Sequence, residues 1–114
     1  MAHKPGEIWA ATLPEDTKPR PVMVVSREEL NRGDTVAVIP FTSQRLDERR
    51  DRPNCVPFAC GEANLDRECV AQADQIQRLF TFELESQIGV VPVEKMAEVV
   101  AALGYALAAS CEPE

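Results

Sequence analysis

Short apolar runs separated by polar turns fill the first two-thirds of the chain, a pattern that is typical of β-strands. The pattern predicts the first three strands at residues 7–13, 21–26 and 34–41. Residues 21–26 are nearly all apolar, as in a strand that is buried on both faces. The Arg32-Gly33-Asp34 turn introduces the third strand, and the polar connection over residues 27–32 has room for one helical turn.

A long charged segment, residues 44–52, precedes the remaining strands. Its only apolar side chain is Leu46, so we expect it to form a surface loop. Pro57 cannot donate a backbone hydrogen bond, which places the strand around it at a sheet edge or at a bulge. Residues 75–82 either extend the strand before them or form a strand of their own. The other predicted strands are 54–60, 69–73 and 88–91, with a polar loop at 61–68.

The last third of the chain changes to a helical period. Apolar residues there recur at i, i+3, i+4, i+7 and i+11, which places them on one face of a helix. Pro92 suits the first helical turn, and Glu94 lies where the helix dipole favours a negative charge. The residues of this face are Met96, Val99, Val100, Leu103 and Leu107. The patterns together predict a mainly β fold, a small twisted antiparallel sheet or partly closed barrel with one C-terminal helix.

The chain length of 114 residues fits one domain, residues 1–114, and we expect its short polar ends at 1–5 and 110–114 to fray. No run of 18 apolar residues exists, so no membrane span is predicted. The N-terminus has no apolar signal-peptide core, and we expect a cytoplasmic location.

The chain has four cysteines, and no two of them form a C-x-x-C pair. They are Cys55, Cys60, Cys69 and Cys111. In a cytoplasmic protein we therefore expect free thiols and neither disulfides nor a metal site. The net charge of −7 argues against a nucleic-acid partner, since phosphate affinity comes from Lys and Arg. A local basic patch on an acidic protein would still permit one.

The residue types rule out several catalytic mechanisms. The single histidine, His3, cannot serve as both acid and base in a two-histidine ribonuclease, nor complete a triad from an N-terminus that we expect to fray. The chain has no glycine-rich phosphate-binding loop, and its acidic residues form no metal-binding pattern. We expect no metal and no other cofactor.

Two short segments can carry chemistry instead. Arg20 precedes Pro21, which biases it toward an extended conformation at the start of an apolar strand. Thr42, Ser43 and Gln44 follow the third apolar strand. An arginine facing hydroxyl groups suits a phosphodiester, because a guanidinium binds two phosphate oxygens at once. On these residues alone, an ordinary loop arginine and an ordinary turn remain the commoner explanation.

The order and spacing of several motifs make the chain resemble the MazF/PemK toxins of bacterial toxin–antitoxin pairs. The resemblance covers residues 5–109, and its motifs together are more specific than each alone. They are residues 5–9 (PGEIW), 20–26 (RPVMVVS), 30–32 (LNR), 35–43 (TVAVIPFTS), 74–76 (DQI), 88–89 (IG) and 92–96 (PVEKM).

This resemblance implies the SH3-like β-barrel of the CcdB/MazF-like plasmid maintenance toxins, usually as a homodimer. It implies metal-independent cleavage of single-stranded RNA, such as mRNA, by attack of the substrate's own 2′-hydroxyl. A cyclic phosphate and a free 5′-hydroxyl would result. By position in the motifs, Arg20 and Thr42 would be catalytic, and Ser43, Asp74 and Gln75 would contact the RNA. A MazE-like antitoxin would be the protein partner.

Three features depart from the family pattern. The loop between Trp9 and Arg20 is short and lacks the glycine and glutamate that usually precede the arginine, and Gln72 and Gln77 stand where some relatives have a basic residue. Two other functions stay open. One is a CcdB-like gyrase inhibitor, although that class ends in Trp-Gly-Ile and the only tryptophan here is Trp9. The other is a PemK-like binding module without catalysis.

Overall fold

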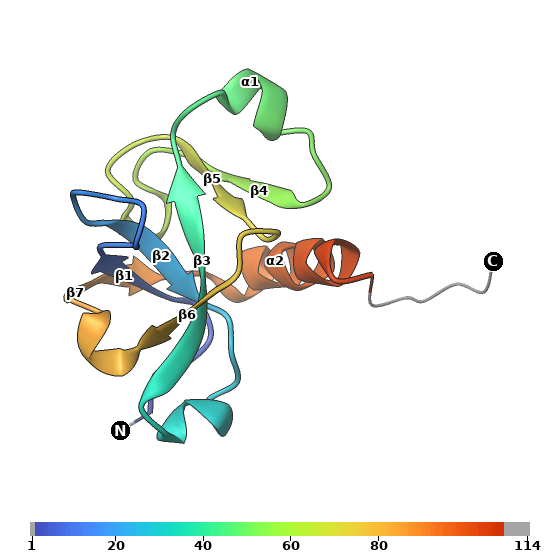
Figure 1. Ribbon diagram of the computed structural model, residues 1–114. Coiled ribbons are helices and arrows are strands. Elements are labelled where there is room, and N and C mark those ends of the chain that lie inside the picture. Colours follow the sequence, from blue (N-terminus) through green and yellow to red (C-terminus); the bar gives the residue numbers. More distant parts are fainter. Residues whose placement is uncertain (1, 109–114) are drawn as a thin grey trace.

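The computed structural model describes residues 2–108, so Met1 and residues 109–114, with Cys111 and the expected frayed C-terminus, lie outside the described part. Within these described residues, seven strands, two α-helices and three 3-10 turns follow one another (Figure 1). The strands are β1 (Glu7–Ala11), β2 (Arg20–Val24), β3 (Thr35–Thr42), β4 (Cys55–Phe58), β5 (Cys69–Gln72), β6 (Gln77–Phe80) and β7 (Ser86–Val90). The helices are α1 (Leu46–Arg49) and α2 (Val93–Ala106), and the 3-10 turns are η1 (Leu30–Arg32), η2 (Glu62–Asn64) and η3 (Thr81–Glu83).

The strands form one antiparallel sheet in the order β4-β5-β3-β2-β1-β7, with β6 added beside β3. The long strand β3 lies in the middle and joins two parts of the sheet: Phe41 and Thr42 pair with β5, whereas Thr35 to Val38 pair with β6. The sheet curls around β3 into a half-barrel (Figure 1). The mainly β, partly closed barrel that the sequence predicts is therefore confirmed.

Alternating side chains build a separate core on each face of the sheet, as the two-residue period of a strand requires. Ile8, Met23 and Ile39 are cross-strand neighbours in β1, β2 and β3, and all three are fully buried in the core that also contacts α2. Val22 and Val38 face the opposite way, into a second core that also contains Leu79 of β6. Burial on both faces explains why residues 21–26 are almost entirely apolar.

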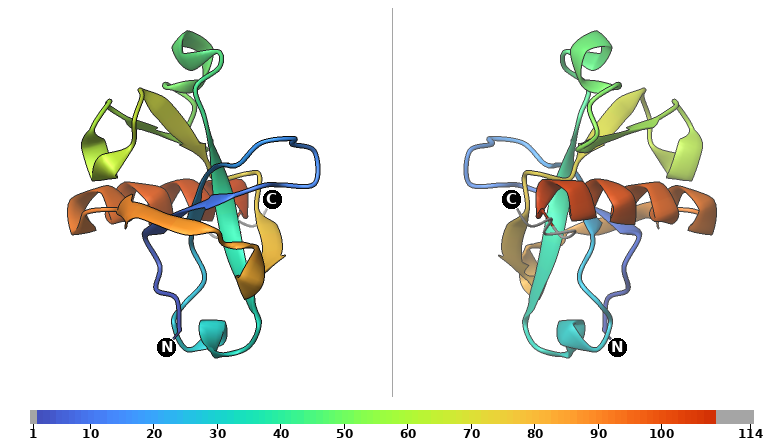
Figure 2. Two further views of the ribbon diagram at one scale, coloured as in Figure 1. Left: turned by 90° about the vertical axis from the view of Figure 1, so that its left-hand side faces the viewer. Right: turned by 90° about the vertical axis from the view of Figure 1, so that its right-hand side faces the viewer.

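Helix α2 lies beneath β4 and β5 (Figures 1 and 2). Val99 and Ala102 are its buried residues, and Met96 and Leu103 pack beside them. The prediction of the apolar face of this helix is wrong in part, because Val100 and Leu107 are exposed. The contact face is turned around the helix axis toward Ala102 and Ala106, so alanine supplies part of the contact.

Two local expectations about the connections have different outcomes. The charged segment 44–52 is not all loop, since residues 46–49 form the one-turn helix α1, in which only Leu46 and Arg49 are half-buried. Pro57 lies in β4, which is an edge strand, as the missing N–H predicted. No helix in the described residues is long and apolar enough to cross a membrane.

The N-terminal residues 2–5 contact the rest of the molecule. His3 packs edge-on against Trp9, with ring centroids 5.0 Å apart, and its Nδ1 lies 3.2 Å from Glu7 Oε1. Its carbonyl accepts a hydrogen bond from Asn31, the one buried polar residue in residues 2–108. The only histidine is therefore held at the η1 end of the sheet.

Candidate active site

A cavity of about 790 Å³ opens where the loop before β2 meets the end of β3. The side chains around it come from β1, β2, β3, β5, β7 and the loops between them. They are Ala10, Asp16, Thr17, Lys18, Pro19, Arg20, Pro21, Phe41, Thr42, Ser43, Gln44, Asn64, Leu65, Asp66, Arg67, Cys69 and Ile88. The cavity therefore contains both segments that the sequence singles out.

Arg20 is the first residue of β2, paired with Ala11 of β1, so the strand fixes its backbone. Asp16 holds its side chain through two short hydrogen bonds, from Nε at 2.6 Å and from Nη2 at 2.7 Å. The remaining terminal nitrogen, Nη1, lies 3.5 Å from the Phe41 carbonyl, at the outer limit of a hydrogen bond. The guanidinium is thus held on one edge, while Nη1 is only weakly engaged.

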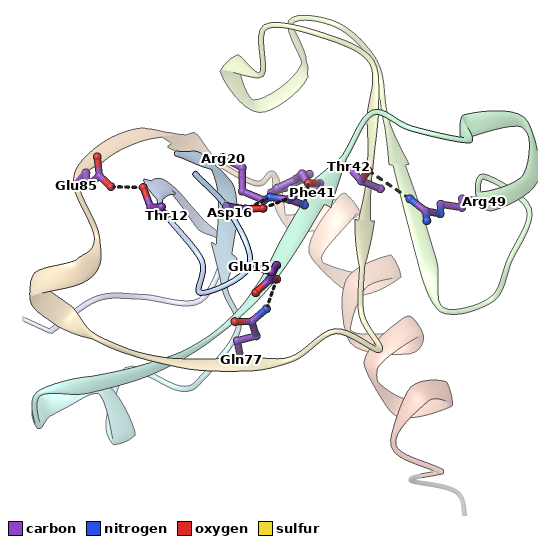
Figure 3. Close-up of polar contacts among 9 residues, drawn as sticks. All are labelled: Thr12, Glu15, Asp16, Arg20, Phe41, Thr42, Arg49, Gln77 and Glu85. Atoms are coloured by element: carbon purple, nitrogen blue, oxygen red, sulfur yellow. Dashed lines mark hydrogen bonds and ion pairs between the residues drawn. The ribbon is translucent and has the colours of Figure 1, made fainter. Parts of the chain in front are cut away.

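The loop that carries Asp16, residues 12–19, is tied to the rest of the molecule at two points (Figure 3). The Thr12 hydroxyl donates to Glu85, and the Gln77 amide of β6 donates to Glu15 at 3.0 Å. Leu13 is buried in the same core as Val22 and Val38. The loop is short, but these contacts hold it over the cavity.

Thr42 ends β3, where its backbone pairs with β5. Its hydroxyl oxygen accepts two hydrogen bonds, one from the Gln44 backbone N–H at 3.2 Å and one from Arg49 Nη1 at 3.3 Å. A threonine hydroxyl has two acceptor lone pairs and one proton to donate. Because both lone pairs are engaged, the group is left as a hydrogen-bond donor, which suits a phosphate oxygen.

The charges that line the cavity nearly cancel. Asp16 pairs with Arg20, and Asp66 lies 3.6 Å from Arg67, so each acidic side chain has a basic partner. Lys18 is the remaining basic residue of the lining. The cavity is therefore weakly basic, in contrast to the net charge of −7 of the whole chain.

The thiol of Cys69 also borders the cavity, and the residue is 4 % exposed. Burial, reinforced by the nearby Asp66 carboxylate, raises the pKa of this thiol to about 11. It is therefore protonated at neutral pH and cannot act as a thiolate nucleophile. Within residues 2–108, no three His, Cys, Asp or Glu side chains are grouped as metal ligands would be.

The structure brings together three of the five site residues that the sequence predicts: Arg20, Thr42 and Ser43. Asp74 and Gln75 lie outside the cavity, in the turn between β5 and β6. There Asp74 accepts a hydrogen bond from Asn54 at 2.7 Å and another from the Gln75 amide. Their contact with RNA stays a prediction.

Two further residues at the site were missed from the sequence. Asp16 holds Arg20, and a carboxylate four residues before an arginine was the available signal. Arg49 reaches Thr42 from α1, whose sequence predicts only a charged surface loop.

Comparisons with known proteins identify relatives of this chain. The sequence profile of the PemK-like, MazF-like toxins of type II toxin–antitoxin systems matches residues 4–107. A comparison with curated proteins finds none that matches.

Solved structures resemble the chain over most of its length. One is an endoribonuclease in complex with its cognate antitoxin from a mycobacterial species, with 24 % identity and a TM-score of 0.80 over 94 % of this chain and 96 % of the other. The Mycobacterium tuberculosis toxin MazF-mt6 has 26 % identity and a TM-score of 0.76 over 90 % and 96 %. A MazE–MazF complex from Deinococcus radiodurans has 21 % identity and a TM-score of 0.73 over 94 % and 96 %.

Proposed function

The chain belongs to the PemK-like, MazF-like toxins of type II toxin–antitoxin systems, and from that premise we propose that it is an endoribonuclease that cleaves single-stranded RNA in the cytoplasm without a metal ion. The proposal is supported by structural relatives described as endoribonucleases. The observation that carries it is the meeting of Arg20 and Thr42 in one weakly basic cavity.

The two side chains offer what a phosphodiester needs. Arg20 Nη1 would donate to a non-bridging oxygen and stabilise the charge that develops on the phosphorane. Thr42 would donate a hydrogen bond from its hydroxyl to the same phosphate, since the lone pairs of the hydroxyl oxygen are already engaged. Arginine is a poor proton acceptor, so its role here is electrostatic.

The nucleophile would come from the RNA itself. The 2′-oxygen forms the new bond to phosphorus and the bond to the 5′-oxygen breaks, while the 2′-hydroxyl loses its proton to solvent water and the 5′-oxygen takes one from solvent water. The products are a 2′,3′-cyclic phosphate and a free 5′-hydroxyl. This route uses no enzyme nucleophile, which agrees with the protonated Cys69 thiol and the distant His3.

Substrate selection would depend on the surroundings of the scissile phosphate. Ser43 is exposed at the cavity and can contact the neighbouring nucleotide. Asp74 and Gln75 are exposed in the β5–β6 turn, where they offer amide and carboxylate groups to an unstacked base. The loop 12–19 forms part of the cavity wall, so its short length would shape the target sequence.

The proposal includes two protein partners. A second copy of the chain is supported by the exposed apolar side chains of α2, among them Val93, Val100 and Tyr105. A MazE-like antitoxin is supported by relatives that were crystallised with theirs. Sedimentation of the isolated protein at micromolar concentration would detect the homodimer.

Cleavage of a long single-stranded RNA in the presence of chelator tests the function. Wild-type protein is expected to give discrete fragments, whereas Arg20→Ala and Thr42→Val lose cleavage by about 10²-fold or more, the loss typical of removing one transition-state donor. Arg27→Ala is the matched control, because Arg27 is exposed at the opposite end of the sheet.

Equal cleavage by wild type and Arg20→Ala would contradict the proposed role of Arg20. Absence of cleavage with any RNA would instead favour a binding module or a gyrase inhibitor. Inhibition of gyrase by the same preparation would separate these two.

A further inference from the structure

We propose that Arg49 is a second phosphate-binding arginine of this site, binding the RNA phosphate that Thr42 contacts. The inference rests on the proposed ribonuclease function and adds to it a residue that neither the resemblance nor the comparisons assign. It depends on the position of the Arg49 side chain, on its charge environment and on its effect on the Thr42 hydroxyl.

The contact between Arg49 and Thr42 carries the proposal. Arg49 Nη1 donates to the Thr42 hydroxyl at 3.3 Å and to the Gln44 carbonyl at 3.2 Å. Figure 3 shows Thr42 between Arg20 on one side and Arg49 on the other. Arg49 does not itself line the cavity, so it approaches Thr42 from outside the cavity wall.

This contact fixes how close Arg49 comes to the substrate. A phosphate oxygen that accepts a hydrogen bond from the Thr42 hydroxyl lies about 2.7 Å from Thr42 Oγ1. Such an oxygen is then at most about 6 Å from Arg49 Nη1, given the 3.3 Å contact. The guanidinium has five N–H donors, of which the two contacts use only those of Nη1. To bind the phosphate directly, the Arg49 side chain would rotate so that a further donor reaches this oxygen.

The charge environment distinguishes Arg49 from the other arginines at the cavity. Arg20 is neutralised by Asp16, and Arg67 faces Asp66. In residues 2–108, no ion pair involves Arg49, and both of its hydrogen-bond partners are uncharged oxygens. Arg49 would therefore offer the dianionic phosphorane beside Thr42 a positive charge that is not paired with a carboxylate.

The fold holds Arg49 in this position. It is half-buried at the last position of α1, where its backbone N–H donates to the Arg45 carbonyl at 3.0 Å. The helix packs against β5, the strand that pairs with Thr42. The next residue, Arg50, points elsewhere and pairs with Glu68. Of these two neighbouring arginines, the fold directs only Arg49 toward the site.

The test compares Arg49→Ala with Arg52→Ala in cleavage and in binding. Arg52 is the matched control, since it is exposed on the same segment and its side chain forms no hydrogen bond or ion pair in the described structure. The probe is a single-stranded RNA oligonucleotide that contains a cleavage site mapped with wild-type protein. The same oligonucleotide with a 2′-deoxynucleotide at that position cannot be cleaved and serves for binding.

We expect Arg49→Ala to lower kcat/KM by about 10- to 100-fold, the range for loss of one hydrogen bond to a charged group. The slope of log affinity against log salt should fall by about 0.7, the value for one phosphate contact with a single strand. Arg49→Lys should keep most of the slope, because it retains the charge. A purely structural role of Arg49 would leave the slope unchanged.

The outcomes separate this inference from the function on which it rests. If wild-type protein cleaves and Arg49→Ala matches Arg52→Ala in both rate and slope, the inference is wrong and the ribonuclease function stands. If wild-type protein cleaves no RNA, both fail. Thermal unfolding of each variant checks folding, and Arg49→Gln replaces Arg49→Ala in the comparison if the alanine variant does not fold.

Discussion

Replacing Asp16 by asparagine removes the negative charge that holds Arg20 while it keeps the shape of the side chain. The carboxylate binds Nε and Nη2 of Arg20, so the guanidinium edge is fixed and Nη1 remains for the substrate. Asparagine can accept only one of these two hydrogen bonds through its oxygen. We expect the guanidinium in Asp16→Asn to sample several rotamers in place of one.

The size of the effect follows from the exposure of the pair. A hydrogen bond to a charged group contributes about 1.5–3 kcal/mol. The Arg20 side chain is 34 % exposed and that of Asp16 is 12 % exposed, so solvent reduces this contribution to about 1–2 kcal/mol. If that energy positions Arg20 in the transition state, kcat falls by about 5- to 30-fold, since 1.4 kcal/mol corresponds to a factor of ten.

Steady-state cleavage of a mapped RNA oligonucleotide separates positioning from binding. Because the variant also removes a negative charge from the cavity, the KM for RNA should stay the same or fall. Glu15→Gln is the matched control: it makes the same change of charge in the same loop, but Glu15 contacts Gln77 and not Arg20. A wild-type kcat in Asp16→Asn, or an equal loss in Glu15→Gln, would refute the positioning role.

Two further predictions concern stability. Asn31 is buried and its side-chain amide donates hydrogen bonds to the carbonyls of His3 and Ser26. Asn31→Ala should therefore lower the free energy of unfolding, measured by urea denaturation, by about 1–3 kcal/mol. A loss below about 0.5 kcal/mol would contradict this. The pKa of Cys69 rises from 9.0 to about 11 on folding, chiefly through burial, so the folded state retains this proton at a pH where the unfolded chain loses it. Stability from this thiol is therefore fully present below pH 9 and is lost as the pH rises toward 11. Urea denaturation at both pH values should show a larger loss for wild type than for Cys69→Ala, in which the raised pKa of Cys55 still contributes.

The sheet could be predicted because its burial pattern is simple. The all-apolar run around Val22 and Met23 reflects one core on each face of β2, and Pro57 marked an edge strand through a missing donor. The helix face was harder to predict. Ala102 is buried and Val100 is exposed, because the helix turns the side of Ala102 and Ala106 toward the core, and the apolar period alone does not indicate that alanines lie on that side.

Of the candidate site, the sequence indicated the residues whose position is fixed by a strand. Arg20 starts β2 and Thr42 ends β3, so strand pairing brings them to one cavity. Asp16 and Arg49 lie in a loop and in a one-turn helix, whose paths depend on tertiary contacts that no local pattern encodes. The acidic composition was misleading for the same reason, since the total charge does not reveal how charges pair around a cavity.

The chemistry of the RNA ends tests the central claim most directly. An oligonucleotide with one mapped cleavage site is incubated in chelator with wild-type protein or Arg20→Ala, and the products are analysed by mass spectrometry. The account predicts a 2′,3′-cyclic phosphate and a 5′-hydroxyl from wild type only, and no cleavage when the single nucleotide before the site is 2′-deoxy. Products with a 5′-phosphate, or cleavage that persists in the 2′-deoxy substrate, would contradict it.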